Sequence, residues 1–171
     1  MRKIKANARH GSDSTEWDIP VTLVKQRTAY LGADMKKLLV PCDGSDSALR
    51  AVRHAAAEAA VEIHLLHVIG PMTPITLSES FSAQRLDERF PPQAAEALEP
   101  AVALLTQAGV GYSIHCLFGD PATEIAAHAR AAGCDAVIMG TRGRGAFASL
   151  MIGSVAAQVV KLVDIPVTLV K

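Results

Sequence analysis

Short apolar runs alternate with stretches of helical periodicity along this chain from Met35 onward. Runs that are rich in β-branched residues and end at glycine, proline or polar residues are typical of buried strands. The pattern predicts strands over residues 37–41, 63–69, 112–118, 136–139 and 165–170. Between these runs, apolar residues recur every three or four positions, as on the buried face of a helix. This spacing predicts helices after Ser47 and over residues 94–107, 122–132 and 155–163.

Strands that alternate with helices demand a parallel sheet covered by helices on both faces, which is an α/β fold. Ser45 or Ser47 can cap the first helix, and Asp120 can cap the helix whose first turn holds Pro121. The buried stripe expected on the first helix consists of small residues: Ala48, Ala51, Val52, Ala55 and Ala59. The segment 71–92 has no clear pattern, and we expect a short helix or a loop there.

The N-terminal region contains a strand that the end of the chain repeats. Residues 1–17 are polar and without periodicity, so we expect a solvated tail. Residues 18–25 read DIPVTLVK, and the same eight residues recur at 164–171. Apolar and polar residues alternate in the same way in the two repeats. Residues 19–24 are therefore predicted to pair antiparallel with residues 166–170, within the chain or across a dimer. Residues 26–34 are expected to form a linker. The alternative to the pairing is that the N-terminal segment is a disordered arm.

A glycine-rich loop follows the strand at 136–139 and leads into the last helix. Its spacing is Gly140-x2-Gly143-x9-Gly153-Ser154. Glycine lets the backbone approach a ligand closely, and a helix start offers free N–H groups and a partial positive charge. Strand, glycine loop and helix start in this order favour a phosphate site. Arg142 and Arg144 add cationic charge, with Arg142 expected to contribute more because it lies inside the Gly140–Gly143 turn.

Asp43 follows the first predicted strand and so lies at the same edge of the sheet as Gly140. In a parallel sheet, ligands bind beyond the carboxyl ends of the strands, close to the point where the strand order reverses. Asp43 is therefore predicted to face the phosphate loop across one crevice. The other interpretation is that Asp43 only shapes the turn before the first helix.

The composition of the chain limits the binding partners and the cellular compartment that we expect. The chain has 171 residues, half of them hydrophobic, and a formal net charge of zero, so no basic face points to nucleic acid. No apolar run reaches membrane-spanning length, so no membrane partner is expected. Cys42, Cys116 and Cys134 show no paired spacing and are expected to be reduced and partly buried, as in a cytoplasmic protein.

The spacing of residues along the sequence gives little support for a metal site, a Walker motif or a catalytic centre. The histidines at positions 54, 64, 67, 115 and 128 show no metal-ligand spacing, so no metal site is predicted. His64 and His67 are three apart in one strand and should face opposite sides. No lysine follows the glycine loop as in a Walker motif, and no nucleophile with its base can be proposed from spacing.

Residues 36–171 resemble the universal stress protein domain, from KKLLVPCDGSDSALRAV to DIPVTLVK. The glycine spacing at 140–154 is similar to the signature of the ATP-binding branch of that family, and Val40-Pro-x-Asp43-Gly-Ser45 and Gly119-Asp-Pro121 match as well. The resemblance implies a flavodoxin-like, adenine nucleotide alpha hydrolase-like fold. In that fold a doubly wound sheet of five parallel strands has the order 3-2-1-4-5. Residues 35–171 would form this domain, and residues 1–34 an extension with an extra strand.

The resemblance also implies which residues would hold an adenine nucleotide. Asp43 would lie by the nucleoside, in a pocket lined by Pro41 and Cys42, and Val68 would pack on the adenine. Met139 and Gly140 would lie under the ribose and phosphates. The residues that would hold the phosphates and the turn into the helix are Arg142, Gly143, Gly153, Ser154 and Val155. The expected cofactor is ATP, with or without Mg²⁺. The expected assembly is a homodimer through the last strand, through the strand at 18–25, or through both.

Three functional interpretations remain open at the level of sequence. The first is an ATP-binding regulatory domain that acts in a stress response. The second is a nucleotide-independent dimeric scaffold, against which the intact glycine set argues. The third is a slow ATPase, for which the chain offers no attacking group and no carboxylate pair for magnesium beyond Asp43. Efficient catalysis is therefore not expected.

Overall fold

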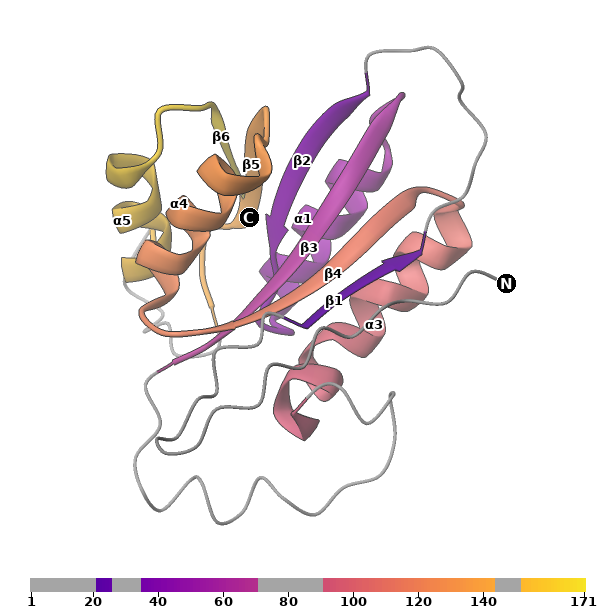
Figure 1. Ribbon diagram of the computed structural model, residues 1–171, viewed down its shortest axis with the longest axis horizontal. Helices are drawn as coiled ribbons and strands as arrows, with labels where there is room; N and C mark the ends of the chain where they lie inside the picture. The colour runs from indigo at the N-terminus through magenta and orange to yellow at the C-terminus, as the bar shows by residue number, and fades with distance from the viewer. Residues whose placement is uncertain (1–20, 26–34, 71–90, 144–151) are drawn as a thin grey trace, which may run out of the picture.

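The sheet at the centre of the molecule has six strands in the order β1-β4-β3-β2-β5-β6. The computed structural model describes residues 21–25, 35–70, 91–143 and 152–171, and Figure 1 shows their arrangement. The strands are β1 (Val21–Lys25), β2 (Lys36–Pro41), β3 (Val61–Ile69), β4 (Gly111–Phe118), β5 (Ala136–Gly140) and β6 (Val167–Val170).

The predicted doubly wound topology is confirmed. From β2 onward all strands pair in parallel, with β3 and β4 on one side of β2 and β5 and β6 on the other. Counted from β2, this is the expected order 3-2-1-4-5. The strand order reverses between β3 and β5, at central β2, and this places the carboxyl ends of those three strands around one crevice.

Four helices cover the two faces of the sheet in the described residues: α1 (Asp46–Ala56), α3 (Pro92–Ala108), α4 (Pro121–Ala132) and α5 (Ser154–Leu162). On one face α1 and α3 pack over residues such as Val40 and Ile63. On the other face α4 and α5 pack over residues such as Leu39 and Val137 (Figure 1). The small buried residues of α1 let that helix lie close to the sheet, as the sequence pattern predicts.

Helix boundaries follow the local signals with one exception. Ser45 accepts a hydrogen bond from the backbone N–H of Ala48, and Asp120 accepts one from that of Thr123. α1 ends at Ala56, so the stripe expected to reach Ala59 stops one turn early. The chain turns instead through Ala60, which has a φ of 55°, and its carbonyl accepts a hydrogen bond from Lys36 N–H at 3.0 Å. The segment 71–90 lies outside the described residues.

The partner of the N-terminal strand differs from the prediction. β1 pairs antiparallel with β4, from Val21 opposite Cys116 to Lys25 opposite Tyr112. It therefore lies at the opposite edge of the sheet from β6, and pairing with residues 166–170 within the chain is wrong. The reason is that β4 is the longer edge strand and has more backbone groups to pair with. β4 extends from Gly111 to Phe118, whereas β6 has only Val167–Val170. Residues 18–20 of the repeated segment lie outside the described residues.

Deleting residues 1–27 should therefore expose β4 and leave β6 as it is. An edge strand without its neighbour has free N–H and C=O groups, and its amides exchange faster. Hydrogen exchange should show a loss of protection in residues 111–118 and none in residues 167–170. Faster exchange confined to β6, or unchanged protection of β4, would contradict the pairing.

None of the helices in the described parts of the chain has the length and apolar character needed to cross a membrane.

Candidate functional site

A cavity of about 610 Å³ opens at the carboxyl ends of β2, β3 and β5. Its volume lies within the usual range for small-molecule sites, and its place is the switch point of the sheet. The cavity is lined by the eleven residues that the family resemblance implies for the site: Pro41, Cys42, Asp43, Val68, Met139, Gly140, Arg142, Gly143, Gly153, Ser154 and Val155.

Asp43 lies where β2 leads into α1, and the structure shows its part in the turn. Its Oδ1 accepts a hydrogen bond from Ser45 N–H at 3.0 Å, which shapes the turn. The cap of α1 comes from the Ser45 side chain rather than from Asp43. Asp43 is also one of the residues that line the cavity.

Cys42 forms a neutral part of the wall. Its backbone N–H donates to the carbonyl of Leu66 at 2.8 Å, and its own carbonyl lies 2.8 Å from His67 Nδ1. The side chain is 3% exposed, and its Sγ lies 3.7 Å from the carbonyl oxygen of Ala97. Burial raises the pKa of the Cys42 thiol to about 11, so the thiol stays protonated and is a poor nucleophile at neutral pH.

The two ends of the glycine-rich loop are tied to the body of the domain. After β5, the N–H of Thr141 donates to the carbonyl of Val170 at 2.8 Å, and the N–H of Gly153 donates to the carbonyl of Thr141 at 2.7 Å. The carbonyl of Arg142 accepts a hydrogen bond from the hydroxyl of Ser47 in α1. Arg142 and Gly143 line the cavity, and Gly143 lies against Asp43, since a Cβ at residue 143 would be 2.5 Å from Asp43 Oδ2. Arg144 lies outside the described residues.

The start of α5 supplies free backbone donors to the cavity. Gly153 occupies the N-cap position, and the helix has no side-chain cap. Ser154, Val155 and Ala156, in its first turn, line the cavity. Uncapped N–H groups and the partial positive charge of a helix start favour an anion at this end. Arg142 adds a cationic side chain there, so the polar end of the cavity suits a phosphate.

Several residues that line the cavity were missed by sequence reasoning. His67, Pro121 and Ile125 belong to this group, together with Ala48, Leu66, Thr141 and Ala156. Pro121 and Ile125 come from the first turns of α4, whose cap at Asp120 was visible in the sequence. The signal that could have identified them is that α4, like α5, begins at the carboxyl edge of the sheet. Of these residues, Leu66, Pro121 and Ile125 join Val68 and Met139 in the apolar part of the lining, which we call the apolar end of the cavity.

The model of the universal stress protein family matches residues 35–171 of this chain. A universal stress protein of Methanocaldococcus jannaschii is 32% identical over 139 residues, which are 80% of this chain and 82% of the relative. A second universal stress protein of that organism has a solved structure, with a TM-score of 0.63 at 29% identity. The match covers 81% of this chain and 97% of that structure.

Two further solved structures contain an adenine nucleotide. A universal stress protein in complex with cAMP has a TM-score of 0.56 at 24% identity and covers 80% of this chain and 96% of its own. A family protein from Arabidopsis thaliana with AMP bound has a TM-score of 0.55 at 24% identity, over 80% of this chain and 91% of its own. Identity at this level shows a shared fold.

Proposed function

The chain belongs to the universal stress protein family, and from this premise we propose that it is a regulatory domain that binds ATP in a stress response. The observation that carries the proposal is the meeting of the predicted residues around one cavity with an apolar end and an anion-binding end. Relatives of the same fold that hold AMP and cAMP support an adenine nucleotide as the class of ligand.

In this proposal the adenine occupies the apolar end of the cavity. Val68 projects from the end of β3 and Met139 from the end of β5, and Pro41 closes the space between them. Flat apolar walls favour a purine ring by burial, which contributes roughly 25 cal/mol per Å² of apolar surface. Asp43 lies beside this region and would accept hydrogen bonds from the hydroxyl groups of the ribose.

The phosphates would lie at the polar end. There they would receive hydrogen bonds from the first N–H groups of α5 and from Gly143, and charge pairing from Arg142. Gly143 and Gly153 would let the backbone approach the phosphate oxygens. Ser154 would add a hydroxyl donor at the first position of the helix.

The cavity favours binding over turnover. Among the described residues that line it, Asp43 is the one carboxylate, so a Mg²⁺ ion would arrive with the nucleotide rather than reside in a protein site. Cys42, the one thiol there, is held in its protonated form by burial. We therefore propose a regulatory role in which bound nucleotide changes the surface of the domain, with at most weak hydrolysis.

We also propose a homodimer, in the cytoplasm. In the described residues β6 has a strand neighbour on one side only, and α5 leaves Val160 and Leu162 exposed. A second copy could pair with that edge and bury those side chains. The three buried free cysteines suit a reducing compartment. Light scattering at the mass of a single 18.0 kDa chain would contradict the dimer.

Arg142→Ala should separate phosphate binding from binding of the nucleoside. A charge-assisted hydrogen bond contributes roughly 1.5–3 kcal/mol, so the variant should bind ATP about tenfold or more weakly. Adenosine has no phosphate, and its affinity should hardly change. Calorimetry with both ligands on the nucleotide-free protein measures the two effects, and mass spectrometry of the protein as purified should identify bound adenine nucleotide.

Arg130→Ala is the matched control, because Arg130 is exposed in the last turn of α4 and does not line the cavity. This variant should bind ATP as the unchanged protein does. Equal losses for ATP and adenosine in Arg142→Ala would mean that Arg142 acts on the fold and not on phosphate. If the unchanged protein binds no adenine nucleotide, the proposed function is wrong.

A further inference from the structure

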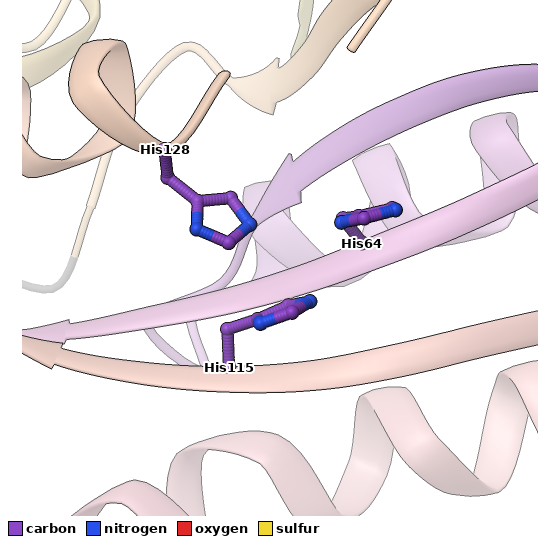
Figure 2. A group of neighbouring side chains, drawn as sticks. All are labelled: His64, His115 and His128. Atoms are coloured by element: carbon purple, nitrogen blue, oxygen red, sulfur yellow. The ribbon is translucent and has the colours of Figure 1, made fainter. Parts of the chain in front are cut away.

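Three histidines from three different elements meet on the face of the sheet that α4 covers (Figure 2). His64 comes from β3, His115 from β4 and His128 from α4. The rings of His64 and His115 are stacked with centroids 5.1 Å apart, and the ring of His128 lies 4.3 Å from that of His115. Each residue offers one nitrogen atom, and these atoms all lie within 4.8 Å of one another.

The cluster is buried, and much of its hydrogen-bonding capacity is unused. The side chain of His64 is 11% exposed, and His115 is 9% exposed. In the described part of the chain, both ring nitrogens of His64 and Nε2 of His128 are buried without a hydrogen-bond partner. A buried polar atom without a partner destabilises the fold, and proteins rarely place several of them together. A metal ion that accepts one lone pair from each ring would remove part of that cost, and the N–H of each ring would remain as a donor.

We propose that His64, His115 and His128 bind one divalent transition-metal ion, and that Zn²⁺ fits this site best. Imidazole nitrogen is a preferred ligand of zinc, which commonly takes three protein ligands and a fourth water or exogenous ligand. Zn–N bonds of about 2.0–2.1 Å require the ligand nitrogens to lie closer together than 4.8 Å. The rings of His64 and His115 are stacked with 9° between their planes, so both side chains must rotate before one ion can contact all three residues.

Groups around the cluster are placed to orient the rings. The hydroxyl of Ser113 lies 2.9 Å from His115 Nε2, and both side chains are buried. On β3, Glu62 Oε1 lies 3.9 Å from His64 Nε2. Histidines that bind metals usually hold their second ring nitrogen in a hydrogen bond to a carboxylate, a carbonyl or a similar partner. Ser113 is in position to serve His115 in this way, whereas the carboxylate of Glu62 would have to move closer to His64 to do the same.

The protonation state of the cluster also suits a metal. Burial lowers the pKa of His64 and of His128, and burial together with the charges of His128 and His64 lowers the pKa of His115 to about 3. The rings are therefore neutral at neutral pH, and the neutral imidazole is the form that binds a metal ion.

The cluster is separate from the cavity at the sheet edge, since none of its three histidines lines that cavity. It lies next to the cavity, however: Ile125 and Leu66 line the cavity, and His128 and His64 are three and two residues away from them. Sequence spacing predicted no metal site because each ligand comes from a separate element. Only the pairing of β3 with β4, which sets Leu66 opposite His115, and the packing of α4 bring them together.

The test is a zinc titration of the untagged full chain after treatment with a chelator. A chromophoric zinc indicator as competitor should report one bound Zn²⁺ per chain, and added zinc should raise the melting temperature. His128→Gln changes a half-buried residue on a helix and should weaken zinc binding by at least about 100-fold, since loss of an outer partner alone costs about 10–100-fold. Ser113→Ala should fall in that smaller range.

His54→Gln is the matched control, because His54 is an exposed histidine of α1 outside the cluster. The zinc affinity of His54→Gln should be unchanged. Arg142→Ala should also bind zinc normally, so an error in the proposed nucleotide site can be told apart from an error in the proposed zinc site. Circular dichroism without metal shows whether each variant is folded. His115→Gln should also weaken zinc binding, and if this variant does not fold, the zinc affinity of His128→Gln tests the proposal. The absence of saturable binding at one equivalent, or equal losses in His54→Gln and His128→Gln, would overturn the proposal.

Discussion

Gly143→Val should abolish ATP binding. A Cβ atom at residue 143 would lie 2.5 Å from Asp43 Oδ2, closer than such atoms approach in real structures. The loop and the turn after β2 meet at this point, so the branched side chain must displace either Asp43 or the loop. Oδ2 is the end of a flexible side chain, so the Asp43 carboxylate can move aside at little cost to the fold, but the displaced group is one that is proposed to hold the ligand.

The same reasoning predicts a graded series. Gly153→Val should also impair binding, because its Cβ would lie 3.3 Å from the carbonyl oxygen of Thr141, at the other end of the loop. Gly111→Val is the matched control: a Cβ there meets no atom within 4 Å, and Gly111 begins β4 away from the cavity. Calorimetry with ATP measures all three variants. Binding by Gly143→Val with the affinity of the unchanged protein would exclude the loop from the site.

Gly140→Ala should lower the free energy of unfolding by about 3 kcal/mol, at the upper end of the usual cost of overpacking. A Cβ at residue 140 would lie 2.6 Å from Ser47 Oγ and 2.8 Å from the backbone nitrogen of Ala48. The end of β5 therefore rests directly on the first turn of α1, and backbone atoms cannot rotate away. The free energy of unfolding of a folded protein is only about 5–15 kcal/mol, so this single methyl group would remove a large share of that stability.

Urea unfolding of Gly140→Ala beside Gly111→Ala measures this effect. The Gly111 variant should be as stable as the unchanged protein or slightly more so, since its Cβ occupies open space and alanine restricts the unfolded chain. Similar midpoints for the two variants would mean that α1 and β5 are not in close contact. Because Gly140 also lines the cavity, its variant should be tested for ATP binding only at a temperature where it is folded.

The sequence by itself determined the elements, their order and the place of the candidate site. Apolar runs and helical spacing predicted every strand from β2 to β6, and local caps at Ser45 and Asp120 set the starts of α1 and α4. These features could be predicted because they depend on neighbours within a few residues. The alternation of strands and helices then predicted a parallel sheet, in which the carboxyl ends of β2 and β5 must lie at the same edge.

Tertiary structure alone decided the features that join distant parts of the chain. Position 140 was assigned to the ligand by resemblance, yet its glycine is required by the contact with α1. β1 pairs with β4 rather than with β6, although its sequence repeats that of β6, because the longer edge offers more backbone partners. His64, His115 and His128 carry no common spacing and meet only through strand pairing and helix packing. Periodicity and capping are local, whereas a contact between distant residues exists only once the sheet register and the helix positions are set.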